Sequence, residues 1–291
     1  MALPRAFLRS PGTEALLARA LREDLGAGDL TTRLCVPATA RAHAQLQARE
    51  AGVAAGLELF ARVFRRLDPK VRVKLKLSDG RPFKAGAVLA ELDGPARALL
   101  SGERVALNLL QRLCGIATLS RNYVAAARTR SASVQVQDTR KTTPGLRLLE
   151  KYAVACGGGT NHRLALDDAI LIKDNHVKAA GSVGTAVRLA RRSKRPVEVE
   201  VEDLAELAQA LDAGADVVLL DNMAPPALRR AVALVAAHRA RTGKRVLTEA
   251  SGGITLKGIA AVAATGVDRI SVGALTHSPR ALDLSLEFVP R

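Results

Sequence analysis

The chain has 291 residues, of which 48% are hydrophobic and 25% charged. This is an ordinary globular composition, and it excludes a largely disordered protein. The net charge is +16, from 44 Lys and Arg against 28 Asp and Glu, which favours anionic partners. Aromatic residues are only 2% and Trp is absent, so a nucleic-acid surface built on base stacking is disfavoured. An anionic small substrate explains a basic pocket equally well, and the rest of the charge has no functional explanation.

The three cysteines, Cys35, Cys114 and Cys156, are far apart and show no paired spacing. They fit a reducing compartment, and neither a disulfide framework nor a zinc site. No apolar run approaches the ~20 residues needed to span a bilayer. Residues 1–10 lack the apolar core of a signal peptide. We therefore expect a cytoplasmic protein with no membrane partner.

The first part of the chain predicts a small sheet with helices. Residues 13–25 carry leucines at helical spacing, and Thr13 can cap that helix. Residues 71–77 alternate between apolar and cationic side chains, which predicts a half-buried strand with one wet face. Further strands are expected at 43–49 and 87–92.

Residues 101–129 predict one long helix or two abutting helices, with Gly115 as a break or a close packing point. This interpretation places Arg104 in the first helical turn, where a cation is mildly unfavourable against the helix dipole. The residues alone thus favour a solvated role for Arg104.

From residue 134 onward, short apolar runs alternate with helical patterns, which predicts a parallel sheet with right-handed crossovers. The expected strands are 134–137, 169–172, 197–201, 217–220, 246–248 and 270–272. The expected helices are 182–192, 203–213, 225–240, 255–265 and 279–286. A closed barrel and an open doubly wound sheet both remain possible, since both place ligands at the carboxyl ends of strands.

Candidate ligand-binding cations gather between residues 138 and 178, after strand-like runs or a glycine-rich turn. They are Arg140, Lys141, His162, Arg163 and Lys173. Strand ends and loop mouths are positions from which side chains converge on one ligand. The arginine fork suits planar carboxylates and phosphates. A set of plain surface cations is the disfavoured alternative, because the spacing is not that of a helix face.

Candidate oxygen ligands follow in the next strands. Glu198, Glu200 and Glu202 share one strand face, where three like charges need cations, a metal or solvent. A solvent-facing row on an edge strand is the alternative. Asp221 directly follows an apolar run, and its alternative role is a helix cap. Such carboxylates suit Mg²⁺, which is usually held together with water and substrate phosphates.

Two glycine loops are candidate phosphate sites. Ser251, Gly252 and Gly253 precede an expected helix, so backbone amides and the helix start can meet an anion. Val272, Gly273 and Ala274 follow the next strand and offer a second set of amides. Paired phosphate sites after the last two strands are frequent in barrels.

These motifs closely resemble the quinolinate phosphoribosyltransferases, the carboxylating nicotinate-nucleotide pyrophosphorylases. The resemblance covers nearly the whole chain in collinear order, at residues 23–32, 103–118, 138–178, 250–254 and 272–277. It implies a smaller N-terminal α/β sandwich domain at 1–114 that includes the start of the connecting helix. An incomplete (β/α) barrel at 115–291 would follow, with the C-terminal helix packing back on the first domain. It also implies a homodimer in which Arg104 is shared across the interface.

The implied reaction converts quinolinate and phosphoribosyl pyrophosphate to nicotinate mononucleotide, pyrophosphate and CO₂ in de novo NAD biosynthesis, with Mg²⁺ as cofactor. The resemblance assigns the carboxylates of quinolinate to Arg104, Arg140, His162 and Arg163, with Thr139 also in the substrate site. It places Lys141 and Lys173 at the reacting centre, and Glu200 (or else Glu198) and Asp221 on ribose hydroxyls or the metal. The two glycine loops would hold the 5′-phosphate. The alternatives are a related pyridine phosphoribosyltransferase with another substrate preference, and a basic nucleic-acid-binding protein.

Overall fold

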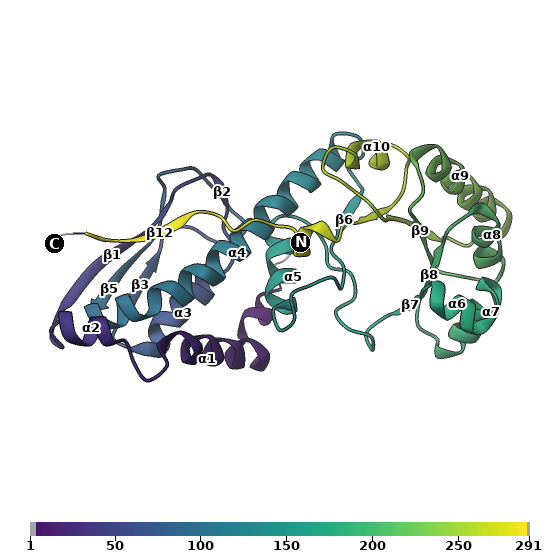
Figure 1. The fold of residues 1–291 in the computed structure, drawn as a ribbon. Helices are drawn as coiled ribbons and strands as arrows, with labels where there is room; N and C mark the ends of the chain where they lie inside the picture. Colours follow the sequence, from purple (N-terminus) through teal and green to yellow (C-terminus); the bar gives the residue numbers. More distant parts are fainter. Residues whose placement is uncertain (1–3, 290–291) are drawn as a thin grey trace. The chain divides into compact units, whose positions relative to one another are not determined.

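The computed structural model describes residues 4–289, which form two compact units (Figure 1). Unit 1 consists of the chain up to Arg121, of Thr142–Gly158 and of the chain from Leu275 onward. Unit 2 consists of Asn122–Lys141 and Gly159–Ala274. The helix that contains residue 114 runs on without interruption from one unit into the other.

Unit 1 is built on a four-stranded antiparallel sheet in the order β12-β1-β5-β3. The strands are β1 (Arg41–Ala48), β3 (Arg72–Leu75), β5 (Val88–Pro95) and β12 (Leu284–Val289), and a separate pair joins β2 (Gly52–Val53) to β4 (Pro82–Phe83). One face is apolar and buried, because Leu46, Leu92 and Leu286 point the same way from neighbouring strands.

The expected C-terminal helix at 279–286 is wrong. The segment forms strand β12, whose Leu286 pairs with Leu46 of β1. Leu284 and Leu286 are buried, whereas Ser285 and Glu287 are half-buried, and this period of two belongs to a strand. Residues 284–289 therefore form an edge strand in the sheet of unit 1.

The helices of unit 1 are η1 (Arg5–Arg9), α1 (Pro11–Leu25), α2 (Leu30–Cys35), α3 (Leu57–Leu67) and α5 (Arg147–Cys156). Helix α1 is capped by Ser10, which accepts the Thr13 N–H at 3.2 Å, so Thr13 is not the cap. The expected wet-and-dry alternation at 71–77 holds only in part, since Val71 is buried while Leu75 is exposed.

Helix α4 (Ala96–Arg128) is a single helix. Gly115 does not break it: a Cβ at this position would lie 2.0 Å from the carbonyl oxygen of Arg280, so the glycine allows a close backbone approach. The helix starts directly after β5, five residues earlier than expected. Arg104 therefore lies well inside the helix and not in its first turn.

Unit 2 holds six parallel strands in the order β6-β11-β10-β9-β8-β7. They are β6 (Gln135–Gln137), β7 (Ile170–Ile172), β8 (Val197–Val201), β9 (Val217–Asp221), β10 (Leu247–Ser251) and β11 (Arg269–Ser271). The helices are α6 (Asp174–Ala180), α7 (Val183–Ala190), η2 (Arg191–Ser193), α8 (Leu204–Asp212), α9 (Pro225–Thr242), α10 (Ile259–Ala263) and α11 (Ala274–His277). Helices α7, α8 and α9 pack along the outside of the strands (Figure 1). This is the expected incomplete (β/α) barrel.

The segment around Thr160 extends this sheet beyond β6. The Thr160 N–H donates to the Val136 carbonyl at 2.8 Å, and the Asp138 N–H donates to the Thr160 carbonyl at 3.2 Å. Asn161 and His162 therefore lie beside Asp138, whose carboxylate accepts from both. In the part of the chain from 4 to 289, no helix combines the length and apolarity needed to cross a bilayer.

Candidate functional site

Polar side chains collect at the carboxyl ends of the six parallel strands of unit 2. Lys173 follows β7, Glu200 lies near the end of β8, and Asp221 and Ser251 end β9 and β10. Asp221 and Ser251 are direct neighbours in the β9–β10 register. The sheet thus brings together residues that lie far apart in the sequence, at the edge where parallel sheets bind ligands.

Lys173, Glu200 and Asp221 form a charged cluster. The Lys173 ammonium lies 2.6 Å from Glu200 Oε2. Burial and the nearby charge of Glu200 raise the pKa of Asp221, whereas Lys173 and Lys141 act to lower it. Two neighbouring carboxylates are a suitable donor set for a hard cation or for sugar hydroxyls, so Glu200 and Asp221 fit Mg²⁺. Glu202 is exposed and does not join this group.

Arg140 and Arg163 form the cationic side of the site. Burial and the charge of Arg140 lower the pKa of the Arg163 guanidinium, while the charge of Glu198 raises it. The Arg163 guanidinium also donates to the Ala169 carbonyl at 3.2 Å, which fixes its direction. Two arginines close enough to repel each other are well placed for a ligand with more than one negative charge.

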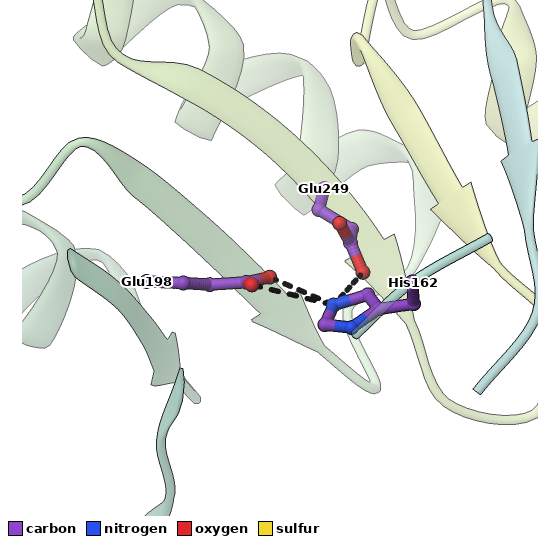
Figure 2. A group of neighbouring side chains, drawn as sticks. All are labelled: His162, Glu198 and Glu249. Carbon is purple, nitrogen blue, oxygen red and sulfur yellow. Dashed lines mark hydrogen bonds and ion pairs between the residues drawn. The ribbon is translucent and has the colours of Figure 1, made fainter. Parts of the chain in front are cut away.

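His162 lies on the barrel interior with both ring nitrogens engaged by the protein. Nδ1 accepts the Arg163 N–H at 2.8 Å. Nε2 faces Glu198 at 3.3 Å and Glu249 at 3.5 Å, as Figure 2 shows. The His162 N–H donates to the buried carboxylate of Asp138 at 2.9 Å. Asp138, which directly follows β6, therefore holds the backbone of His162 in place.

Glu249 is the site residue that the sequence patterns did not single out. It lies in the middle of β10, is fully buried, and accepts the Ser271 hydroxyl. Burial and the charge of Glu198 raise its pKa to about 7. The only sign in the sequence is one acidic residue within an otherwise uncharged run, Val246 to Ser251.

The Ser251–Gly253 loop needs glycine. Gly252 has φ +89°, and a Cβ there would lie 2.2 Å from Asn222 Oδ1. Gly253 has φ +60° but faces open space. The short helix α10 begins only at Ile259, so the helix expected from 255 is much shorter and starts later. Any phosphate at this loop would therefore meet loop amides, not a helix start. The second loop, Val272–Ala274, leads directly into α11.

The remaining predicted residues have separate positions. The Thr139 hydroxyl accepts the Lys141 N–H at 3.0 Å, and His176 Nδ1 accepts the Lys173 N–H at 2.9 Å. Both contacts orient the backbone at a candidate lysine. Arg104 belongs to unit 1, where its side chain is 59% exposed and lies 3.9 Å from Glu103.

Comparison with known proteins covers both parts of the chain. Residues 29–114 match the model of the quinolinate phosphoribosyl transferase N-terminal domain, and residues 116–287 match that of its C-terminal domain. A probable nicotinate-nucleotide pyrophosphorylase (carboxylating) of Bacillus subtilis is 46% identical over 91% of this chain and 89% of its own length. The Mycobacterium leprae nicotinate-nucleotide pyrophosphorylase (carboxylating) is 44% identical over 93% and 95%.

Solved structures agree with these matches. NadC from Streptococcus pyogenes superposes with a TM-score of 0.89 at 40% identity and covers both chains completely. The nicotinate-nucleotide pyrophosphorylase from Francisella tularensis gives a TM-score of 0.90 at 39% identity, over 97% of this chain and 99% of that one.

Proposed function

We propose that this chain, which belongs to the quinolinate phosphoribosyltransferase family, converts quinolinate and phosphoribosyl pyrophosphate to nicotinate mononucleotide, pyrophosphate and CO₂. It would act as a carboxylating nicotinate-nucleotide pyrophosphorylase in de novo NAD biosynthesis. The observation that carries this proposal is the pair Arg140 and Arg163 next to a lysine–carboxylate cluster on the same barrel edge. The two arginines suit the two carboxylates of quinolinate. The lysine–carboxylate cluster suits the phosphates and ribose hydroxyls of phosphoribosyl pyrophosphate.

The protein's own part in this reaction is to position two anions and to stabilise charge. The pyridine nitrogen attacks the anomeric carbon as pyrophosphate leaves, so positive charge develops on the ribose and negative charge on the leaving group. Arg140 and Arg163 would hold the quinolinate carboxylates, with His162 at the base of the site. Lys141 and Lys173 would face the phosphates or a carboxylate at the reacting centre. Effects of this kind lower barriers through orientation and preorganised electrostatics.

The ribose and metal side of the site would be formed by Glu200 and Asp221. Their carboxylate oxygens are the ligand type that Mg²⁺ prefers. When bound, Mg²⁺ supplies charge neutralisation to the pyrophosphate group. The amides of the loops at Gly252, Gly253 and Gly273, with the Ser251 hydroxyl, would hold the 5′-phosphate.

The protein would act as a homodimer in the cytoplasm. We propose that Arg104 is supplied to the active site by the partner subunit. This is supported by its exposed side chain on α4 and by its position in unit 1, whereas the other candidate residues lie in unit 2. Cys35, Cys114 and Cys156 are free thiols, which supports a reducing compartment.

The decisive experiment is turnover of quinolinate with phosphoribosyl pyrophosphate and Mg²⁺, following both pyrophosphate and the mononucleotide. We expect the two products in equal amounts, no turnover without phosphoribosyl pyrophosphate, and loss of turnover in excess chelator that added Mg²⁺ restores. Nicotinate in place of quinolinate is the matched control. Turnover of nicotinate but not of quinolinate would overturn the substrate assignment, and full activity in chelator would overturn the metal.

A further inference from the structure

The hydrogen bonds of His162 determine where its ring proton lies. A backbone N–H is always a donor, so the 2.8 Å contact from Arg163 N makes Nδ1 an acceptor without a proton. The one ring proton must then be on Nε2, and the imidazole is neutral. Nε2–H points toward the two carboxylates of Glu198 and Glu249 (Figure 2). His162 is therefore an internal connection between β8, β10 and the backbone of Arg163.

A metal ion does not fit this cluster, although His162, Glu198 and Glu249 offer ligand atoms within 4.8 Å of one another. A histidine that binds a metal through Nε2 donates its Nδ1–H to an acceptor. Here Nδ1 faces a donor, so metal binding at Nε2 would require an imidazolate or a lost hydrogen bond. The Nε2 proton of His162, and not a metal ion, therefore lies between the carboxylates of Glu198 and Glu249.

The surroundings of Glu249 favour a neutral carboxyl. The residue is fully buried, and its Oε2 has no hydrogen-bond partner among residues 4–289. Its Oε1 accepts from the Ser271 hydroxyl and faces His162 Nε2. The Glu198 carboxylate lies on the other side of the same nitrogen. Burial first, and then the charge of Glu198, raise the pKa of Glu249, while His162, the Ser271 hydrogen bond and Arg269 act in the opposite direction. An ionised carboxylate with an unsatisfied buried oxygen is costly.

We propose that Glu249 is a positioning residue that, together with Glu198, accepts the Nε2–H of His162 and holds the imidazole in a single tautomer. This tautomer keeps Nδ1 free to accept the Arg163 N–H, and so sets the backbone from which the Arg163 guanidinium projects. Only the last step, from Arg163 to the substrate carboxylates, rests on the proposed function. The position and tautomer of His162 are properties of the folded protein alone.

Three variants separate positioning from plain stability. Glu249→Gln keeps a neutral side chain with an oxygen acceptor, so it should keep the tautomer and lose less than about threefold in kcat/KM for quinolinate. Glu249→Ala removes the acceptor and should lose at least about tenfold, roughly 1.4 kcal/mol. Thr248→Val is the matched control: Thr248 lies on the same strand and is buried, but it bonds to Asp268 and not to His162. It should destabilise the protein with little effect on quinolinate.

The tautomer is measured directly by ¹⁵N NMR of the imidazoles, since the chain has only 5 histidines and His162→Gln identifies one signal. We expect a neutral Nε2–H ring from about pH 6 to 8 in the wild type and in Glu249→Gln, and a mixed or titrating ring in Glu249→Ala. An imidazolium or an Nδ1–H ring in the wild type would overturn the proposal, as would a Glu249→Gln protein that is as impaired as Glu249→Ala.

The two measurements fail independently. If the wild type shows the expected tautomer but does not use quinolinate, the proposed function is wrong and the positioning of His162 stands. If quinolinate is used but the tautomer differs, only the role of Glu249 is wrong. Should Glu249→Ala not fold, the wild type and Glu249→Gln still decide, because both the tautomer and its retention are measured on them.

Discussion

The ammonium of Lys173 and the carboxylate of Glu200 lie 2.6 Å apart and join the ends of the neighbouring strands β7 and β8. Lys173 also counters the repulsion between Glu200 and Asp221, since its charge lowers the pKa of Asp221. Lys173→Met keeps the apolar length and removes the charge. We expect kcat to fall by about 100-fold, roughly 2.7 kcal/mol of transition-state stabilisation, measured by steady-state turnover of quinolinate.

Lys178→Met is the control for this change. Lys178 lies on α6, close in sequence to Lys173, and its ammonium pairs with Asp174 at 73% exposure. An exposed pair of this kind contributes little, so activity should be unchanged. Equal kcat values in both variants would remove Lys173 from the reacting centre.

The arginine side of the site is tested by Arg140→Lys, which keeps the charge but loses the bidentate fork. We expect at least a tenfold loss in kcat/KM for quinolinate, roughly 1.4 kcal/mol, with a folded protein by circular dichroism. Arg192→Lys in η2, an exposed position outside the site, should behave as wild type. Unchanged quinolinate kinetics in Arg140→Lys would exclude carboxylate binding by Arg140.

Glu249 should impose a pH dependence on stability. Its pKa in the folded protein is raised to about 7, above the ~4.3 of an unfolded Glu. Between these values the folded state binds more protons than the unfolded state, so the free energy of unfolding falls as pH rises. The full loss is on the order of 4 kcal/mol and is complete only about one pH unit above the pKa of the folded state.

Urea unfolding at a series of pH values measures this effect. Glu249→Gln cannot ionise, so the difference in unfolding free energy between wild type and variant should shift in favour of the variant as pH rises from about 4.5 to 7. A difference that stays constant over this range would show that Glu249 has an ordinary pKa.

Strand periodicity made part of this site predictable from the sequence. Lys173, Glu200 and Asp221 follow or end apolar runs, and parallel strands bring such positions to one edge. Period-two alternation also predicts that Glu198 and Glu200 share one face of β8. It does not predict which group each carboxylate contacts: Glu198 faces His162, and Glu200 faces Lys173. That difference depends on which neighbouring segment each carboxylate meets.

Other features depend on contacts distant in the sequence. Glu249 lies in an uncharged run, and its importance appears only through His162 and Ser271, which come from other segments. The sequence pattern predicts a helix at 279–286, whereas residues 284–289 form a strand. Its alternation becomes decisive only when β1 offers an edge to pair with.

The glycine loop after β10 offers a matched pair of substitutions. Gly252→Ala and Gly253→Ala both introduce a side chain at positive φ, so both carry backbone strain. Only at Gly252 would the new Cβ collide with Asn222. We expect KM for phosphoribosyl pyrophosphate to rise at least about tenfold in Gly252→Ala and clearly less in Gly253→Ala. Equal KM values in the two variants would show that the close approach to Asn222 does not shape the phosphate site.

Arg104 permits a test of whether two subunits share each active site. Arg104→Ala and Asp221→Ala should each be inactive, because one removes the proposed partner-supplied cation and the other a carboxylate of the barrel. If Arg104 acts across a two-fold interface, a mixed dimer contains one site with both lesions and one site with none. Random exchange makes half of the dimers mixed, so roughly a quarter of wild-type activity should return.

If each site were built from one chain, every site in the mixture would carry a lesion and no activity would return. Subunit exchange must therefore be verified independently, for example by mass spectrometry of differently tagged subunits. A mixture of Arg104→Ala with Arg140→Ala should also recover, because these residues would again come from different subunits. Asp221→Ala with Arg140→Ala should not, since both residues lie in unit 2 of the same chain. Confirmed exchange without recovery in the first two mixtures would exclude the shared site.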